Sequence, residues 1–180
     1  MNTGSIAIRY CRALFEEARI AEVDHDIYHA FSTLQQSLKA MPDIQATLNS
    51  PRIAKDRKIR LLLTASQCYV PLWERFLRLV LAYQREGLLR IMIFVYSEIF
   101  REHHQIDHVV FATATPADAD TRKRVEQKVH SQTGRKVELE TLVRPELIGG
   151  FCLLIGDRLY DYSYRTKLQN IRKQIWNKSK

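Results

Sequence analysis

Two patterns in the sequence could hold a small ligand, but neither is complete. His25 and His29 stand four residues apart, so a helix would place both imidazoles on one face, where they could share a cation. A closed metal site needs further ligands, and the sequence offers no third one at a telling spacing. Gly149-Gly150 could cradle a phosphate only if it preceded a helix, whereas an apolar stretch follows it. We expect a solvated helix face at the histidines and a bend or bulge at the glycines.

Covalent catalysis is not indicated by the cysteines or serines. Cys11, Cys68 and Cys152 are far apart and form no C-x-x-C pair, which argues against a disulfide framework or a zinc site and favours a reducing compartment. Cys152 lies in an apolar stretch, where a thiol is usually an inert small hydrophobe. The sequence contains no G-x-S-x-G element. We therefore predict no catalytic residue, no metal ligand and no cofactor.

The charged residues indicate an acidic partner. Lys and Arg number 28 against 20 Asp and Glu, which gives a net charge of +8. One basic cluster runs from Arg52 to Arg60, and another follows Asp161 to the end of the chain. Charge alone gives only the unspecific part of nucleic-acid binding, and neither stacking aromatics on a sheet nor a G-x-x-G loop is clear. A basic RNA-binding or ribosome-associated factor remains the alternative to a protein that meets acidic protein surfaces.

Residues 1–105 show apolar side chains at helical spacing and predict the first of two domains. The pattern indicates six amphipathic helices with brief connections, which form an all-helical bundle. Pro42 and Pro71 are well placed at helix starts, and Gly87 interrupts the pattern before the last helix. The expected helices cover residues 6–18, 24–38, 42–48, 55–66, 71–83 and 88–103.

After residue 105 the apolar period changes from 3.6 toward 2, which predicts a second, smaller domain over residues 106–180. Strands are expected at 109–113 and 137–143, with a helix from Asp118 to Thr133 between them. Residues 151–155 and 158–162 form a hairpin around Gly156-Asp157, and a last helix follows Tyr164. The order β-α-β-β-β-α makes this an α/β domain, so the whole chain is α+β.

A membrane span is not expected. The longest apolar run, Ile91 to Tyr96, has six residues, whereas roughly 20 are needed to cross a bilayer. The N-terminal residues lack the basic start and apolar stretch of a signal peptide.

Several segments, in order and at family spacing, carry a resemblance to a known family. They are RYCRALFEEA at 9–18, LNSPRI at 48–53 followed by Lys58, the fifth-helix segment around Phe76 with Arg85 after it, LIGGF at 147–151, IGD at 155–157, DYS at 161–163 and Lys167-Leu168. This set resembles the δ subunit of F-type ATP synthases, called the oligomycin-sensitivity-conferring protein (OSCP) in mitochondria. The resemblance covers roughly residues 5–176. Arg144, Tyr162 and Gln84 depart from the family pattern, where Asp, Gly and Gly are usual.

The resemblance implies a non-catalytic connector in the stator. Such a subunit ties the catalytic head, CF(1) in one nomenclature, to the peripheral stalk and resists rotor torque while proton transport drives ATP synthesis. Domain 1–105 would bind the N-terminal helix of an α subunit, and domain 106–180 would bind the b subunits. We expect a protein that is monomeric in isolation, binds no nucleic acid, and is membrane-associated only through the complex, at the cytoplasmic face of the cell inner membrane.

Particular residues are assigned to these roles. On the first and fifth helices, Tyr10, Leu14, Leu79 and Tyr83 are expected to bind the α-subunit helix, whereas Phe15 and Phe76 are expected in the core. The basic residues Arg172, Lys178 and Lys180 are expected to bind the b subunits by charge. The family signature, with a structural role, consists of Gly149, Gly150, Gly156, Asp161 and Ser163.

Overall fold

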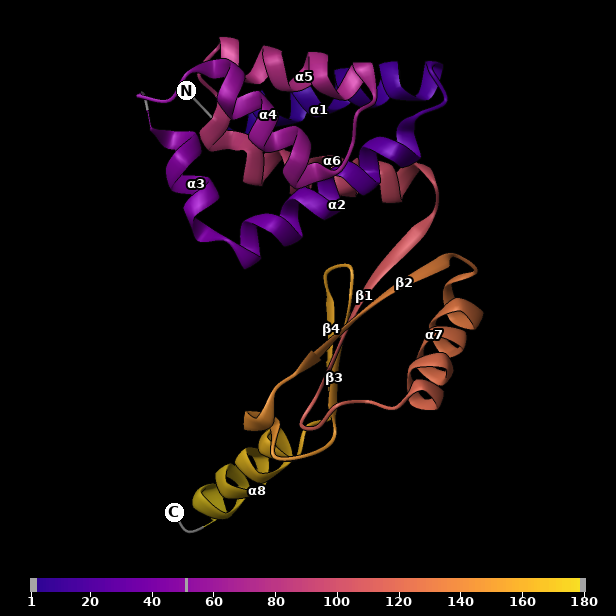
Figure 1. Cartoon of the computed structure of the whole chain (residues 1–180). Helices are drawn as coiled ribbons and strands as arrows, with labels where there is room; N and C mark the ends of the chain where they lie inside the picture. The colour runs from indigo at the N-terminus through magenta and orange to yellow at the C-terminus, as the bar shows by residue number, and fades with distance from the viewer. Residues whose placement is uncertain (1–2, 51, 179–180) are drawn as a thin grey trace. The chain divides into compact units, whose positions relative to one another are not determined.

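The chain folds into two units, which divide between Phe100 and Arg101. The structure is a computed structural model and describes residues 3–50 and 52–178. The N-terminal unit (Met1–Phe100) is made of helices, and the C-terminal unit (Arg101–Lys180) holds a sheet with helices (Figure 1). The mixed α+β class predicted from the sequence is confirmed.

The helices of the N-terminal unit begin and end at recognisable signals. Pro42 and Pro71 each stand in a first turn, where the missing N–H costs no hydrogen bond. Gln67 ends its helix in the left-handed conformation, with φ of 50°. The elements are α1 (Thr3–Ile20), α2 (Asp24–Ala40), α3 (Pro42–Asn49), α4 (Lys55–Ser66), α5 (Pro71–Ala82), the 3-10 turn η1 (Glu86–Leu88) and α6 (Leu89–His103), which runs on past Phe100.

Aromatic side chains form the core of the N-terminal unit and hold α1 and α5 in place. Phe31 of α2 is fully buried, and its ring centroid lies 4.7 Å from that of Trp73 on α5 and 4.8 Å from that of Tyr96 on α6. Tyr96 also meets the ring of Phe15 from α1 edge-on at 5.9 Å. Because burying each aromatic side chain contributes about 1.5–3 kcal/mol, this cluster fixes the positions of both outer helices.

The C-terminal unit is built on a four-stranded sheet with the order β2-β1-β3-β4. β1 is parallel to β2 and antiparallel to β3, which is antiparallel to β4. The helix α7 makes the crossover between the parallel strands, capped by Asp118 at its start and by Gly134 at its end. The elements are β1 (Ile106–Thr113), α7 (Ala119–Thr133), β2 (Lys136–Val143), the 3-10 turn η2 (Pro145–Leu147), β3 (Phe151–Ile155), β4 (Arg158–Asp161) and α8 (Tyr164–Lys178).

The first strand starts three residues before the predicted position. Two of the three missed residues, Asp107 and His108, are polar, and both find charged partners beside the strand. The carboxylate of Asp107 accepts a hydrogen bond from Arg135 at 3.1 Å, and His108 lies 3.2 Å from a carboxylate oxygen of Glu140 on β2. Apolar alternation alone does not mark a strand whose end is held by polar side-chain contacts.

Candidate partner-binding surfaces

The N-terminal unit carries an open groove of about 830 Å³ between α1 and α5. The two helices run antiparallel along it. Tyr10 of α1 lies at the same end as Arg85, which follows α5, whereas Glu17 of α1 pairs at 3.8 Å with Arg75 near the start of α5. The groove is lined by Arg9, Tyr10, Ala13, Leu14, Glu17, Leu72, Arg75, Phe76, Arg78, Leu79, Ala82, Tyr83 and Arg85.

All four residues predicted to bind the α-subunit helix line this groove. Leu14 is 4% exposed and belongs to its floor, and Tyr10 is half-buried. Leu79 and Tyr83 are 45% and 62% exposed, so both rise from its rim. The structure therefore brings these side chains together on an apolar surface open to a ligand, and their role in binding stays a prediction.

The prediction that Phe15 and Phe76 are core residues is confirmed. They are 3% and 5% exposed. Phe76 also borders the groove, where it lies beneath the more exposed positions of α5. Burial of large apolar rings under a half-exposed rim gives the groove a rigid base.

Arg85 is a groove residue that the sequence assigned to no site. Its guanidinium carbon lies 5.0 Å from the ring centroid of Tyr10 and 5.5 Å from that of Tyr83, within the range of cation–π attraction. Arg85 and Tyr10 are far apart in the sequence, so only the packing of the helices reveals this contact. The only sequence signal was the place of Arg85 in the family pattern after the fifth helix.

A buried ion pair holds the turn that carries Arg85. Nζ of Lys58 lies 2.8 Å from Oε1 of Glu86, and the two side chains are 6% and 15% exposed. Gln84 takes a positive φ of 54°, and Nζ of Lys55 donates a long hydrogen bond of 3.5 Å to the carbonyl oxygen of Ala82. Lys58, part of the family resemblance, therefore has a structural task at the end of the groove.

In the C-terminal unit, α8 presents an exposed apolar stripe. Tyr164, Leu168, Ile171 and Ile175 recur every three or four residues, so they share one helix face. Their exposed fractions lie between 52% and 62%, and the neighbouring Trp176 is 69% exposed. An aligned apolar face of this kind is typical of a surface that meets another protein.

The basic residues predicted to bind the b subunits lie in and after this helix. Arg172 is exposed on α8. The side chain of Lys178 and the whole of Lys180 lie outside the described residues. The sequence reasoning rested on charge and missed the apolar stripe, although its spacing was visible in the sequence.

The signature residues Asp161 and Ser163 form the N-terminal cap of α8. The hydroxyl oxygen of Ser163 accepts a hydrogen bond from the backbone N–H of Thr166 at 3.3 Å. The carboxylate of Asp161 accepts hydrogen bonds from the N–H of Ser163 at 2.9 Å, from the hydroxyl of Thr166 at 2.7 Å and from the thiol of Cys152 at 3.2 Å. These bonds, Ser163 foremost, hold the pKa of Asp161 well below its usual range.

The signature glycines Gly149 and Gly150 lie where the backbone closely approaches other atoms, as expected for a bend at this pair. A Cβ at Gly149 would lie 2.7 Å from the ring of Tyr164, and one at Gly150 would collide with the carbonyl oxygen of Tyr162. Gly150 also has a φ of 73°, which disfavours other residues. Gly156 forms the turn between β3 and β4 with a φ of 54°. The bend at Gly149-Gly150 is therefore a structural feature that seats the start of α8.

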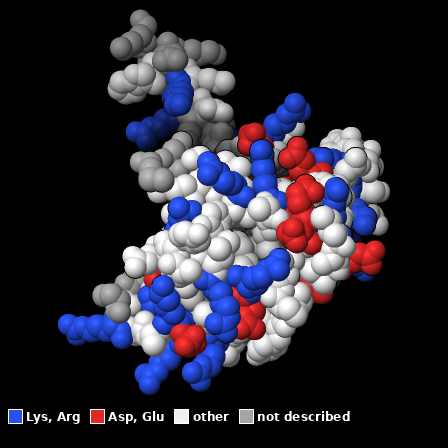
Figure 2. Space-filling model, turned by 90° about the horizontal axis from the view of Figure 1, so that it is seen from above, with Lys and Arg blue, Asp and Glu red and all other residues white. Residues whose placement is uncertain are grey.

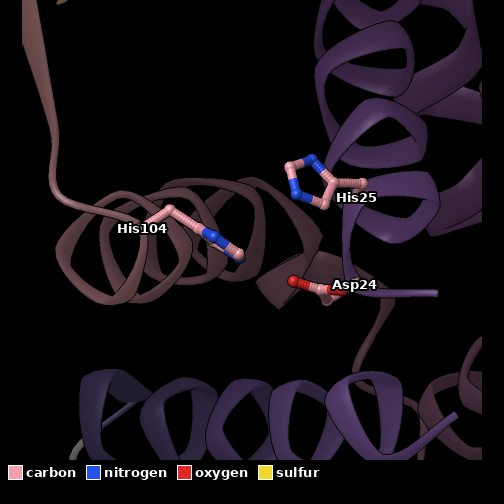
Figure 3. Close-up of side chains that lie close together, drawn as sticks. All are labelled: Asp24, His25 and His104. Carbon is pink, nitrogen blue, oxygen red and sulfur yellow. The ribbon is translucent and has the colours of Figure 1, made fainter. Parts of the chain in front are cut away.

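Among the described residues, His25 and His29 do not belong to a common cluster of possible metal ligands. His25 lies edge-on to Phe100 at 5.0 Å, and both histidines are exposed. Figure 3 draws Asp24 and His25 together with His104, which follows α6 and belongs to the C-terminal unit. None of these three side chains is without a partner. We assign no cation site to them.

Basic side chains surround the groove. Figure 2 looks down on the face of the N-terminal unit that lies uppermost in Figure 1; basic side chains are scattered over it, and acidic side chains gather on part of it. Four arginines and one carboxylate, that of Glu17, are among the lining residues. Arg75 pairs with Glu17 and Arg78 with Glu74, so the excess positive charge comes from Arg9 and Arg85 and favours an occupant with acidic groups.

An apolar groove on packed helices and an exposed apolar helix face are features typical of proteins that bind helices of other proteins. The family model "ATP synthase delta (OSCP) subunit" matches residues 6–175. The chain is 36% identical to ATP synthase subunit delta of Parabacteroides distasonis over 173 residues, 96% of each chain. It is 32% identical to the subunit delta of Bacteroides fragilis over an alignment of 183 residues, which covers all of this chain and 98% of the relative.

A solved structure has the same fold. It is a chain of the Toxoplasma gondii mitochondrial ATP synthase hexamer, with a TM-score of 0.73, 19% identity and coverage of 98% of both chains. The protein belongs to the ATP synthase delta (OSCP) subunit family.

Proposed function

We propose that this chain is the stator connector of an F-type ATP synthase, which joins the catalytic head to the peripheral stalk and holds the head against the torque of the rotor. The family match over nearly the whole chain supports this role. The main support for this role is the groove between α1 and α5. It has an apolar floor and an exposed rim, and it is large enough to hold a helix. The RNA-binding alternative has no support from these relatives.

The groove receives the N-terminal helix of an α subunit. Its lining from Leu72 on α5 to Tyr83, directly after α5, corresponds to about 16 Å of helix, enough to contact roughly three turns of a partner. Leu79 and Tyr83 would bury their exposed surface against the apolar face of that helix, while Tyr10 keeps its hydroxyl toward water at the rim. The six-helix bundle acts as the receiving domain, which ends near residue 105.

The C-terminal domain, residues 106–180, binds the C-terminal part of the b subunits through α8. The apolar stripe from Tyr164 to Ile175 would pack against a b helix, and Arg172 with the lysines after it would face acidic side chains. Burial of the stripe supplies the free energy, whereas the basic residues favour correct partners and faster association.

The connector changes no covalent bond and needs no cofactor. It is monomeric in isolation and peripheral to the membrane, at its cytoplasmic face. No helix in residues 3–50 and 52–178 has the length and apolar character to cross a bilayer.

The α-subunit contact is tested by calorimetric titration of the full chain with a synthetic peptide that covers the N-terminal helix of the α subunit of the same organism. Tyr10→Asp removes an aromatic ring from the groove, and Leu79→Asp places a charge on its apolar rim. Each should weaken binding at least tenfold, because apolar contact is lost or a charge is desolvated. Circular dichroism must show that both variants stay folded. Unchanged affinity in both variants would remove the groove from the proposal.

The b-subunit contact is tested with the C-terminal segment of b, with Trp176 as the reporter. The chain has two tryptophans, and Trp73 is fully buried whereas Trp176 is 69% exposed. Binding should therefore shift Trp176 emission to the blue, and Trp176→Phe removes the signal. Charge reversal of Arg172, Lys178 and Lys180 should weaken binding at low salt and less at high salt. Wild-type affinity of these reversals at low salt would refute the charge contribution.

A further inference from the structure

The groove has unequal ends, and this inequality bears on which helix it accepts. At one end, Glu17 of α1 and Arg75 of α5 form an ion pair of 3.8 Å, so the two charges offset each other. At the other end stand Arg9 and Arg85, both among the lining residues. Neither arginine forms an ion pair with a carboxylate in the part of the chain that the structure describes.

Arg85 is set up to receive a carboxylate. Its guanidinium lies against the rings of Tyr10 and Tyr83, at 5.0 and 5.5 Å from their centroids, and the side chain is half-buried. Contact with ring faces restrains a guanidinium without using its N–H donors, so those donors stay available to a planar acidic group. The buried Lys58–Glu86 pair fixes the turn before binding, which lowers the ordering cost at that moment.

We propose that the groove selects an amphipathic helix with an acidic side chain at one end, and that Arg85, supported by Arg9, binds this carboxylate between the two tyrosines. Apolar contacts with Leu14 and Leu79 hold the helix, and the carboxylate fixes which end of it lies over Arg85. A helix in the reverse direction would place its acid beside Glu17 and leave Arg85 covered without an anion. This inference rests on the proposed function and adds the specificity and direction of the same site.

The test is a double-mutant cycle with the full chain and the α-subunit N-terminal peptide. In the protein, Arg85→Gln removes the positive charge and the paired N–H donors of the guanidinium. Arg85→Lys keeps the charge but loses the planar group that lies against the tyrosine rings. Arg90→Gln is the matched control, because Arg90 is exposed on α6 and does not line the groove. In the peptide, each Asp or Glu is replaced in turn by its amide.

Arg85→Gln should weaken binding roughly tenfold at low salt and flatten its salt dependence, whereas Arg90→Gln should bind as wild type. One amide substitution near one end of the peptide should cause the same loss and add nothing in combination with Arg85→Gln. Arg85→Lys should retain only part of the affinity.

Two results overturn the inference in different ways. If the wild-type chain binds the peptide but Arg85→Gln matches Arg90→Gln, or if every amide substitution is additive with Arg85→Gln, the acid-selecting end does not exist and the groove proposal stands. If the wild-type chain does not bind the peptide at all, the proposed function of the groove fails and this inference falls with it.

Discussion

Truncation of Leu79 to alanine gives a quantitative test of the groove. Leu79 is 45% exposed in the free chain, so a bound helix can still bury a little under half of its surface. Full burial of a leucine side chain contributes about 1.5–3 kcal/mol, and the share left for binding is therefore about 0.7–1.4 kcal/mol. Leu79→Ala should raise the Kd for the α-subunit peptide by roughly three- to tenfold, as measured by calorimetric titration at several temperatures.

Two control variants separate binding from folding in this experiment. Phe94 on α6 is 64% exposed but does not line the groove, so Phe94→Ala should leave the Kd unchanged. Leu77 is fully buried on α5, and Leu77→Ala should lower the free energy of unfolding by about 2–5 kcal/mol, far more than Leu79→Ala. The reasoning is refuted if Leu79→Ala and Phe94→Ala have equal affinity, or if Leu79→Ala destabilises the chain as much as Leu77→Ala.

Three further predictions concern stability. Lys58→Met should cost about 3–5 kcal/mol in urea unfolding, because it leaves a buried carboxylate without its partner, and removing that carboxylate as well should restore part of the loss. Hydrogen bonds, first from Ser163, lower the pKa of Asp161 on folding. The stabilisation that they give is therefore present above about pH 4 and is lost as the pH falls through the lowered pKa. Acid titration followed by circular dichroism should show this loss of stability, and Asp161→Asn should abolish this part of the pH dependence. Gly150→Ala should lower the melting temperature more than Gly134→Ala, since both have positive φ but only a Cβ at Gly150 meets backbone atoms.

The groove residues could be paired by sequence only within each helix. Tyr10 and Leu14 are four residues apart, as are Leu79 and Tyr83, so each pair had to share a helix face. That α1 and α5 lie side by side came from the resemblance and not from the spacing. The adjacency of α1 and α5 depends on the packing of the buried rings around Phe31. Such packing is a property of the whole core and cannot be predicted from the spacing of residues within one helix.

The α8 surface shows the opposite failure. Leu168, Ile171 and Ile175 have clear helical spacing, but an apolar stripe in a sequence is normally assigned to the core. Only the structure shows that these side chains are more than half exposed. The basic residues were identified because charged side chains are expected at the surface. The apolar residues were missed because an apolar stripe is not expected there.

The separation of the two surfaces into different units leads to a prediction about their independence. The groove lies within residues 9–85 and the α8 stripe within residues 164–176, so no side chain serves both. Leu79 and Ile171 belong to different units, so their substitutions should have additive effects, with each partner's affinity lowered only by the variant on its own surface. Two contacts made by one chain together keep the subunit bound in the complex. The double variant should therefore dissociate from purified ATP synthase more readily than either single variant. A Leu79 variant that weakens b binding would show that the two surfaces are coupled and would contradict a connector made of two independent binding sites.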